Sequence, residues 1–209
     1  GTAPSVTTSP TSATVLNNTS VTLTSAATGS PTPSVKWQVL PVGGSWSDIS
    51  GATGVNYTFT SAAANSGKQY RAVYTNAYGS ATTNAATIYV LTLSAFSPSG
   101  TTAGNTVTLT GSGFTGATSV KFNGTAATFS VVSDTSITTT VPVGATSGTI
   151  TVIAGGKTVT SASSFVVGAL PQVTGFSPSS VAVGGTLVIT GSSFADVANQ
   201  NTVIFTGTS

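Results

Sequence analysis

The chain has 209 residues, of which 39% are hydrophobic and 4% are charged, and its formal net charge is +2. Soluble proteins carry about 25% charged residues, and disordered ones combine high charge with low hydrophobicity, so this composition excludes disorder and predicts a packed core. The five basic residues are scattered along the chain, which excludes the basic patch that nucleic-acid binding needs.

Residues 1–90 predict an all-β sandwich. Apolar residues alternate with polar ones, which is the two-residue period of half-buried strands. The alternating residues are Val21, Leu23, Val35, Trp37, Val39, Tyr57, Phe59, Tyr70, Ala72 and Tyr74. Clusters rich in Gly, Pro, Asn and Ser separate these runs and predict turns.

This first unit resembles the immunoglobulin superfamily, in particular the bacterial Ig-like domains of large surface proteins (I-set-like). The resemblance rests on Val21–Ser25, Gly29, Pro31, Pro33, Val35, Trp37, Ser66, Gly67, Tyr70, Ala72 and Asn76. It implies that Trp37 is the core tryptophan of the third strand and that Tyr70 is the tyrosine corner. Ser25 and Ala72 stand where the family has its disulfide, so packing around Trp37 must replace that bridge.

A segment that begins at Phe96–Ser99 recurs 80 residues later at Phe176–Ser179, and the similarity continues to Phe114 and Phe194. Beyond a three-residue insertion, Val120–Thr125 corresponds to Val203–Thr208. Self-similarity at the length of a domain indicates a tandem array. The sequence therefore predicts a second module over 91–168 and an incomplete third module over 169–209.

Both later units resemble the IPT/TIG type of Ig-like domain. The similarity rests on Phe96–Ser99, Gly104, Val107–Gly111, Gly113–Phe114, Val120–Gly124, Ile137, Val141–Pro142 and Gly148–Val152. The resemblance implies tandem Ig-like β-sandwiches, which serve either as DNA-binding domains or as extracellular spacers. The missing basic residues favour the spacer role. The joins at Tyr89–Thr92 and Val167–Pro171 are short and predict a semi-rigid rod.

The residue inventory predicts no enzyme, no cofactor and no metal site. His and Cys are absent, and the three carboxylates are Asp48, Asp134 and Asp196, one in each module. General acid–base chemistry needs a base or a carboxylate pair, and zinc or calcium needs several clustered ligands. Asp48 and Asp134 are therefore expected only to cap their own turns.

Trp46 is the candidate contact with a ligand or partner. An exposed Trp stacks on sugars or anchors a partner, whereas the alternative is that Trp46 packs on its own sheet near Ile49. Thr106, Thr108 and Thr110 line one strand face, which suits either ice or carbohydrate binding or plain β-propensity.

Together these features predict an extracellular or cell-surface structural array without a transmembrane segment. The leading interpretation is a surface stalk, adhesin or self-assembling filament, whose partners are copies of itself or neighbouring modules. The alternatives are a glycan-binding accessory region of a secreted glycoside hydrolase and a passive spacer. The third module is expected to be completed either by further chain or by strands of a neighbouring copy.

Overall fold

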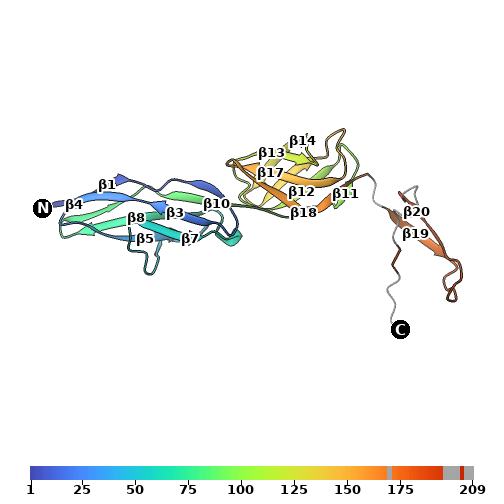
Figure 1. Cartoon of the computed structure of the whole chain (residues 1–209), viewed down its shortest axis with the longest axis horizontal. Coiled ribbons are helices and arrows are strands. Elements are labelled where there is room, and N and C mark those ends of the chain that lie inside the picture. The colour runs from blue at the N-terminus through green and yellow to red at the C-terminus, as the bar shows by residue number, and fades with distance from the viewer. Residues whose placement is uncertain (169–170, 195–202, 205–209) are drawn as a thin grey trace.

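The computed structural model describes residues 1–168, 171–194 and 203–204. This part of the chain is all-β, which confirms the predicted fold class. It contains one short 3-10 turn, η1 (Ala63–Asn65). Figure 1 shows two elongated sandwiches joined end to end, with the N-terminus at the far end of the first.

The first sandwich holds two sets of paired strands. On one side, β1 pairs with β4 and β3 pairs with β7, both antiparallel. On the other side, the strand order is β10, β8, β5, β6, with β2 parallel to β10 and β9 beside β8. The strands are β1 (Thr2–Thr8), β2 (Ala13–Leu16), β3 (Ser20–Thr24), β4 (Ala26–Ser30), β5 (Ser34–Leu40), β6 (Ser47–Asp48), β7 (Asn56–Thr60), β8 (Lys68–Asn76), β9 (Gly79–Thr82) and β10 (Ala86–Ser97).

The core of the first sandwich is built around Trp37, which is fully buried, as predicted. Its indole Nε1 donates a hydrogen bond to the Gly54 carbonyl at 2.8 Å. The buried Ser25 Oγ lies 2.7 Å from the Tyr74 hydroxyl, and Ala72 is fully buried on the same strand as Tyr74. A hydrogen bond and close packing thus occupy the place of the family's disulfide.

The second sandwich begins with the second half of β10. One sheet has the order β15, β16, β12, β10, and the other has the order β11, β18, β17, β13, β14. Its core contains the rings of Phe114, Phe122 and Phe165, with Phe122 and Phe165 edge to face at 4.9 Å. The strands are β11 (Gly100–Thr101), β12 (Thr106–Ser112), β13 (Ala117–Phe122), β14 (Thr125–Ala127), β15 (Phe129–Ser133), β16 (Ser136–Thr140), β17 (Gly148–Ala154) and β18 (Lys157–Val167).

Strand β10 belongs to both sandwiches, so no loop separates them. Ile88 and Val90 point into the first core, and the next residue, Leu91, points into the second. Side chains of a regular strand alternate between faces, so adjacent buried residues mark the point where the strand leaves one core and enters the other. The join predicted at Tyr89–Thr92 is thus continuous strand.

The third unit is described as a hairpin of β19 (Gln172–Ser177) and β20 (Val188–Ser192). Its register repeats that of β10 and β12 with an offset of 80 residues: Gln172 faces Ser192 where Thr92 faces Ser112. The irregularity between Val173 and Gly175 also repeats. An incomplete sandwich leaves apolar residues of its core face uncovered, and Val188 and Phe194 of this unit are 57% and 39% exposed. Phe205 lies outside the described residues.

Candidate functional site

The outer face of the sheet formed by β5, β6 and β8 carries a connected group of polar side chains. Lys36 Nζ donates to Asp48 Oδ2 at 2.8 Å, and Gln38 Nε2 donates to Asp48 Oδ1 at 2.7 Å. Arg71 Nε donates to Gln38 Oε1 at 2.9 Å, and its guanidinium lies 4.0 Å from the centre of the Trp46 ring. Three of the eight charged residues of the chain therefore meet on one face.

Trp46 is neither buried in the core nor fully exposed. Its side chain is half-buried, and the guanidinium of Arg71 covers the ring in a cation–π contact. In the described part of the chain, no other aromatic ring lies close enough to pair with it. Trp46 thus packs on the outside of its own sheet and keeps part of its surface available for contact.

Asp48 does not cap its own turn, so the sequence interpretation of this residue was wrong. The hydrogen bond from Lys36, followed by that from Gln38, lowers the pKa of the Asp48 carboxyl from its ordinary value. The carboxylate is therefore charged at neutral pH. Its ion pair with Lys36 is open to solvent, with side-chain exposures of 53% and 49%, so it contributes little to stability.

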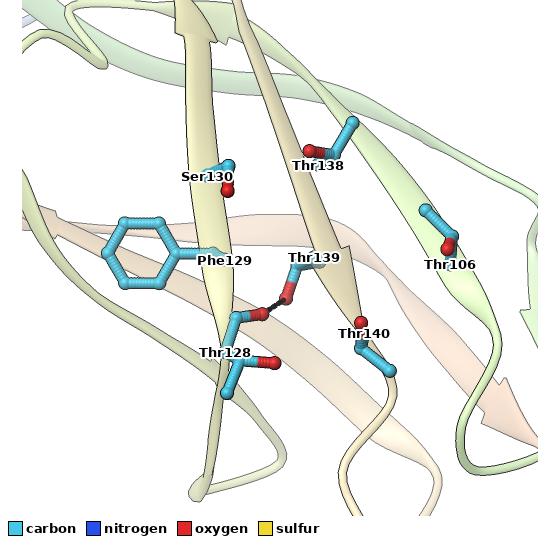
Figure 2. A pocket seen from close by; sticks show the side chains of 7 residues that line it. All are labelled: Thr106, Thr128, Phe129, Ser130, Thr138, Thr139 and Thr140. Atoms are coloured by element: carbon cyan, nitrogen blue, oxygen red, sulfur yellow. Dashed lines mark hydrogen bonds between the residues drawn. The ribbon is translucent and has the colours of Figure 1, made fainter.

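The threonine row on β12 is wider than the sequence indicated. Thr106, Thr108 and Thr110 face hydroxyl-bearing residues of β16. The partner of Thr108, Thr138, in turn faces Ser130 of β15, so hydroxyls continue across three strands. Thr106, Ser130, Thr138 and Thr140 line a hollow of about 190 Å³, together with Thr128, Phe129 and the buried Thr139. Figure 2 shows these side chains and the hydrogen bond that Thr139 Oγ1 donates to the Thr128 carbonyl at 2.8 Å. Threonine favours exposed strand positions on its own account, and this explains the surface without a ligand.

The first sandwich has a matching face on β3 and β7. The facing pairs are Ser20–Thr60, Thr22–Thr58 and Thr24–Asn56. The hydroxyls of Thr22 and Thr58 lie 2.9 Å apart, within hydrogen-bonding distance. Both sandwiches thus present an uncharged, polar face on equivalent strand pairs.

Asp134 joins the two sandwiches. Its carboxylate accepts hydrogen bonds from Gly113 N at 3.1 Å, Thr115 Oγ1 at 2.9 Å and Ser66 Oγ at 2.8 Å. Ser66 belongs to the first sandwich, and its Oγ also accepts the Val90 amide at 3.0 Å. The expectation that Asp134 only caps its own turn is therefore wrong, because its partners lie 19 to 68 residues away.

Two further contacts close this junction. Ser112 Oγ donates to the Val90 carbonyl at 2.6 Å, so both polar backbone groups of Val90 are bonded by serine side chains. Leu16 of β2 packs against the core of the second sandwich. Hydrogen bonds to charged groups contribute about 1.5–3 kcal/mol each, which makes this a firmly held joint.

Over the part of the chain that the structure describes, His, Cys, Asp and Glu nowhere gather in a group of three that could hold a metal ion. A helix long and apolar enough to span a membrane is likewise absent from those residues.

Two domain families match successive parts of the chain. Residues 91–167 match the IPT/TIG domain, and residues 3–92 match a domain of unknown function (DUF8696). A stretch of 79 residues, 38% of the chain, is 48% identical to Endoglucanase C of Cellulomonas fimi, of which it spans only 7%.

Similar solved structures include the titin Ig tandem domains A164-A165, at 13% identity and a TM-score of 0.43, covering 80% of this chain and 96% of that one. The titin A168169 structure gives 16% identity and a TM-score of 0.41, covering 80% of this chain and 100% of that one.

Two sandwiches in line, a third unit that repeats the pairing of the second, and the domain match over 91–167 all point to the same architecture. The chain is a tandem array of β-sandwich modules, and its residues 91–167 are similar to the IPT/TIG domain.

Proposed function

We propose that the chain is a non-catalytic, extracellular structural array that holds other parts of a secreted or cell-surface protein at a fixed distance. The modules are 1–90, 91–168 and 169–209, and their main partners are neighbouring modules. The observation that carries the proposal is the shared strand β10, whose residues Val90 and Leu91 enter different cores without a loop. A surface stalk is the simplest form, and an adhesin or a self-assembling filament uses the same rod.

The joint at Ser66 provides the test. Ser66→Ala removes the hydroxyl that bonds both Val90 N and Asp134 and leaves the Val90 amide without its partner. Ser34→Ala is the matched control, because Ser34 Oγ donates an exposed hydrogen bond to the Thr75 carbonyl within the first sandwich. In the wild type and in Ser34→Ala, the residual dipolar couplings of both sandwiches are expected to fit one common alignment tensor, because the joint is rigid. In Ser66→Ala, each sandwich is expected to need its own alignment tensor, because the joint has become mobile.

If the two sandwiches of the wild-type chain already require separate alignments, the rigid spacer is refuted. Light scattering distinguishes the stalk from the filament. A chain that stays monomeric at high concentration excludes self-assembly as its role.

A glycan-binding accessory region is the second candidate. It is supported by the partly accessible Trp46 and by the similarity to a stretch of an endoglucanase. Retention of the chain on insoluble cellulose, lost in Trp46→Ala but kept in the exposed-surface control Tyr78→Phe, is the expected result. Equal retention of the wild type and Trp46→Ala would remove Trp46 from this role.

A further inference from the structure

A second feature of the first sandwich has no part in the rod. A hollow of about 280 Å³ opens where β5, β6, β7 and β8 meet the η1 turn. Its lining includes Asp48, Tyr57, Phe59, Asn65, Lys68 and Tyr70. Ligand sites are hollows with apolar or aromatic walls and a few converging polar groups, and this volume lies just below the roughly 300–1,000 Å³ of drug-sized sites, which suits a small ligand.

Three aromatic rings form one wall of this hollow. Tyr57 and Phe59 stack at 5.2 Å along β7, and Phe59 stacks on Tyr70 of β8 at 4.9 Å. The rings hold each other in place, so the wall exists before any ligand arrives. A preformed wall lowers the entropy cost of binding.

The two phenol hydroxyls of this wall have no internal partner. Neither the Tyr57 nor the Tyr70 hydroxyl forms a hydrogen bond with any residue in the described part of the chain, although Tyr70 is only 4% exposed. No polar side-chain atom in that part is both fully buried and without a partner, so the Tyr70 hydroxyl must reach solvent. Tyr70 lines the hollow, so we expect its hydroxyl to reach solvent there. Burial raises the pKa of Tyr70 to about 12, and it also raises that of Tyr57, so both remain protonated donors at neutral pH.

The charged groups around the hollow are engaged by their neighbours. The Asp48 carboxylate is paired with Lys36 and accepts from Gln38, and Lys68 Nζ donates to the amide oxygen of Asn65 at 2.5 Å. Asn65 is neutral, so the Lys68 ammonium keeps its charge, and a carboxylate-bearing sugar is the comparison that tests its effect. A neutral ligand loses less hydration than an ionic one on entry. The free groups are hydroxyls that both donate and accept, beside aromatic surface. That combination fits a ring with C–H faces and several hydroxyls.

We propose that this hollow, here called the Tyr57–Tyr70 pocket, binds a single neutral pyranose, such as the end or a side branch of a glycan. The Tyr57 and Tyr70 hydroxyls bond its hydroxyl groups, and the aromatic wall covers its apolar C–H surface. Trp46 does not line this pocket. The proposal is independent of the rigid joint, because alignment of the sandwiches and sugar binding are separate measurements.

The test is a titration of the isotope-labelled full chain, followed by amide chemical shifts, with D-glucose, D-galactose, D-mannose and N-acetyl-D-glucosamine. Sodium D-glucuronate is the charged comparison. Saturable shifts in the millimolar range, centred on residues 48–49, 57–60 and 65–70, are expected for at least one neutral sugar. The double variant Tyr57→Phe/Tyr70→Phe keeps both rings and is expected to weaken binding by about 10-fold, because it loses two hydrogen bonds. Tyr78→Phe, on an exposed tyrosine outside the pocket, is expected to bind like the wild type.

A melting experiment separates binding from structure. Tyr70→Phe removes a hydroxyl that has no protein partner, so its melting temperature is expected to equal or exceed that of the wild type. Tyr74→Phe removes the partner of Ser25 and is expected to melt lower. The proposal is overturned if no neutral sugar gives saturable shifts, if glucuronate binds more tightly than all four, or if the double variant binds as well as the wild type.

Discussion

Strands β10 and β12 and strands β19 and β20 form the same hairpin twice, with the same register, but the first is buried and the second is open. Phe114 is fully buried, whereas its counterpart Phe194 is 39% exposed. Phe96 is half-buried, whereas its counterpart Phe176 is 58% exposed. The difference lies in what covers them, since the sheet of β13, β17 and β18 closes over the first hairpin. A two-stranded hairpin is marginally stable by itself, so these residues become a core only when a second sheet packs on them.

The largest expected difference concerns local opening. The Leu109 amide lies in a strand paired on both sides, whereas Ile189 lies in a strand that pairs with β19 alone among the described residues. Hydrogen exchange at Leu109 is expected to require unfolding of the sandwich, with an opening free energy of about 5–15 kcal/mol. Exchange at Ile189 is expected to need about 1 kcal/mol or less. Comparable protection at both amides would mean that something covers the second hairpin in solution.

Truncating the matched phenylalanines sharpens the comparison. Phe114→Ala is expected to lower the stability of the second sandwich by about 3–5 kcal/mol, because it leaves a cavity in a closed core. Phe194→Ala is expected to change it by less than about 0.5 kcal/mol. Urea unfolding followed by circular dichroism measures both. Tryptophan fluorescence is the internal control, because Trp37 and Trp46 both belong to the first sandwich and should unfold at an unchanged midpoint.

The matched glycines give an intermediate effect. A Cβ at Gly111 would meet the Thr92 carbonyl and lie 2.7 Å from the Phe114 ring, and one at Gly191 would meet the equivalent atoms of Gln172 and Phe194. Gly111→Ala is expected to lower the melting temperature of the second sandwich, at a cost of about 1–3 kcal/mol. Gly191→Ala is expected to leave that transition where it is. A stable Gly111→Ala variant would show that β10 and β12 can move apart.

The smallest effect is expected on the outer face. Val188 stands where the repeat predicts the counterpart of Thr108, and it is 57% exposed. Val188→Thr and Thr108→Val are each expected to change stability by less than about 0.5 kcal/mol, because neither side chain is in a core. Calorimetry of the two variants checks this. A loss of more than about 1 kcal/mol in Thr108→Val would assign the hydroxyl row a structural role.

Local patterns were enough to predict the strands and the repeat. The alternation around Trp37 and the 80-residue offset gave the all-β fold and the equivalence of the two hairpins, because both depend on neighbouring residues. The joint was not predictable in the same way. Asp134 bonds Ser66 across 68 residues, and no spacing rule relates those positions.

Function was harder to predict for the same reason. Trp46 was identified from its residue type, yet the contact with Arg71 depends on how β6 lies beside β5 and β8. Tyr70 was recognised for its place in the strand pattern, whereas its unpaired hydroxyl is visible only once Tyr57 and Lys68 surround the same hollow. Residue type suggests candidates, and tertiary packing decides which of their atoms remain free.

The shared strand also orders events during synthesis. A chain leaves the ribosome from its N-terminus, and the first sandwich closes when Ile88 and Val90 reach its core. At that moment, residues 91–97 continue the same strand and emerge already extended. β12 then pairs with a strand that is already held in place. Less conformational entropy is therefore lost when the second sandwich begins to fold. The first sandwich thus provides the first strand of the second, and we expect the second sandwich to fold after the first.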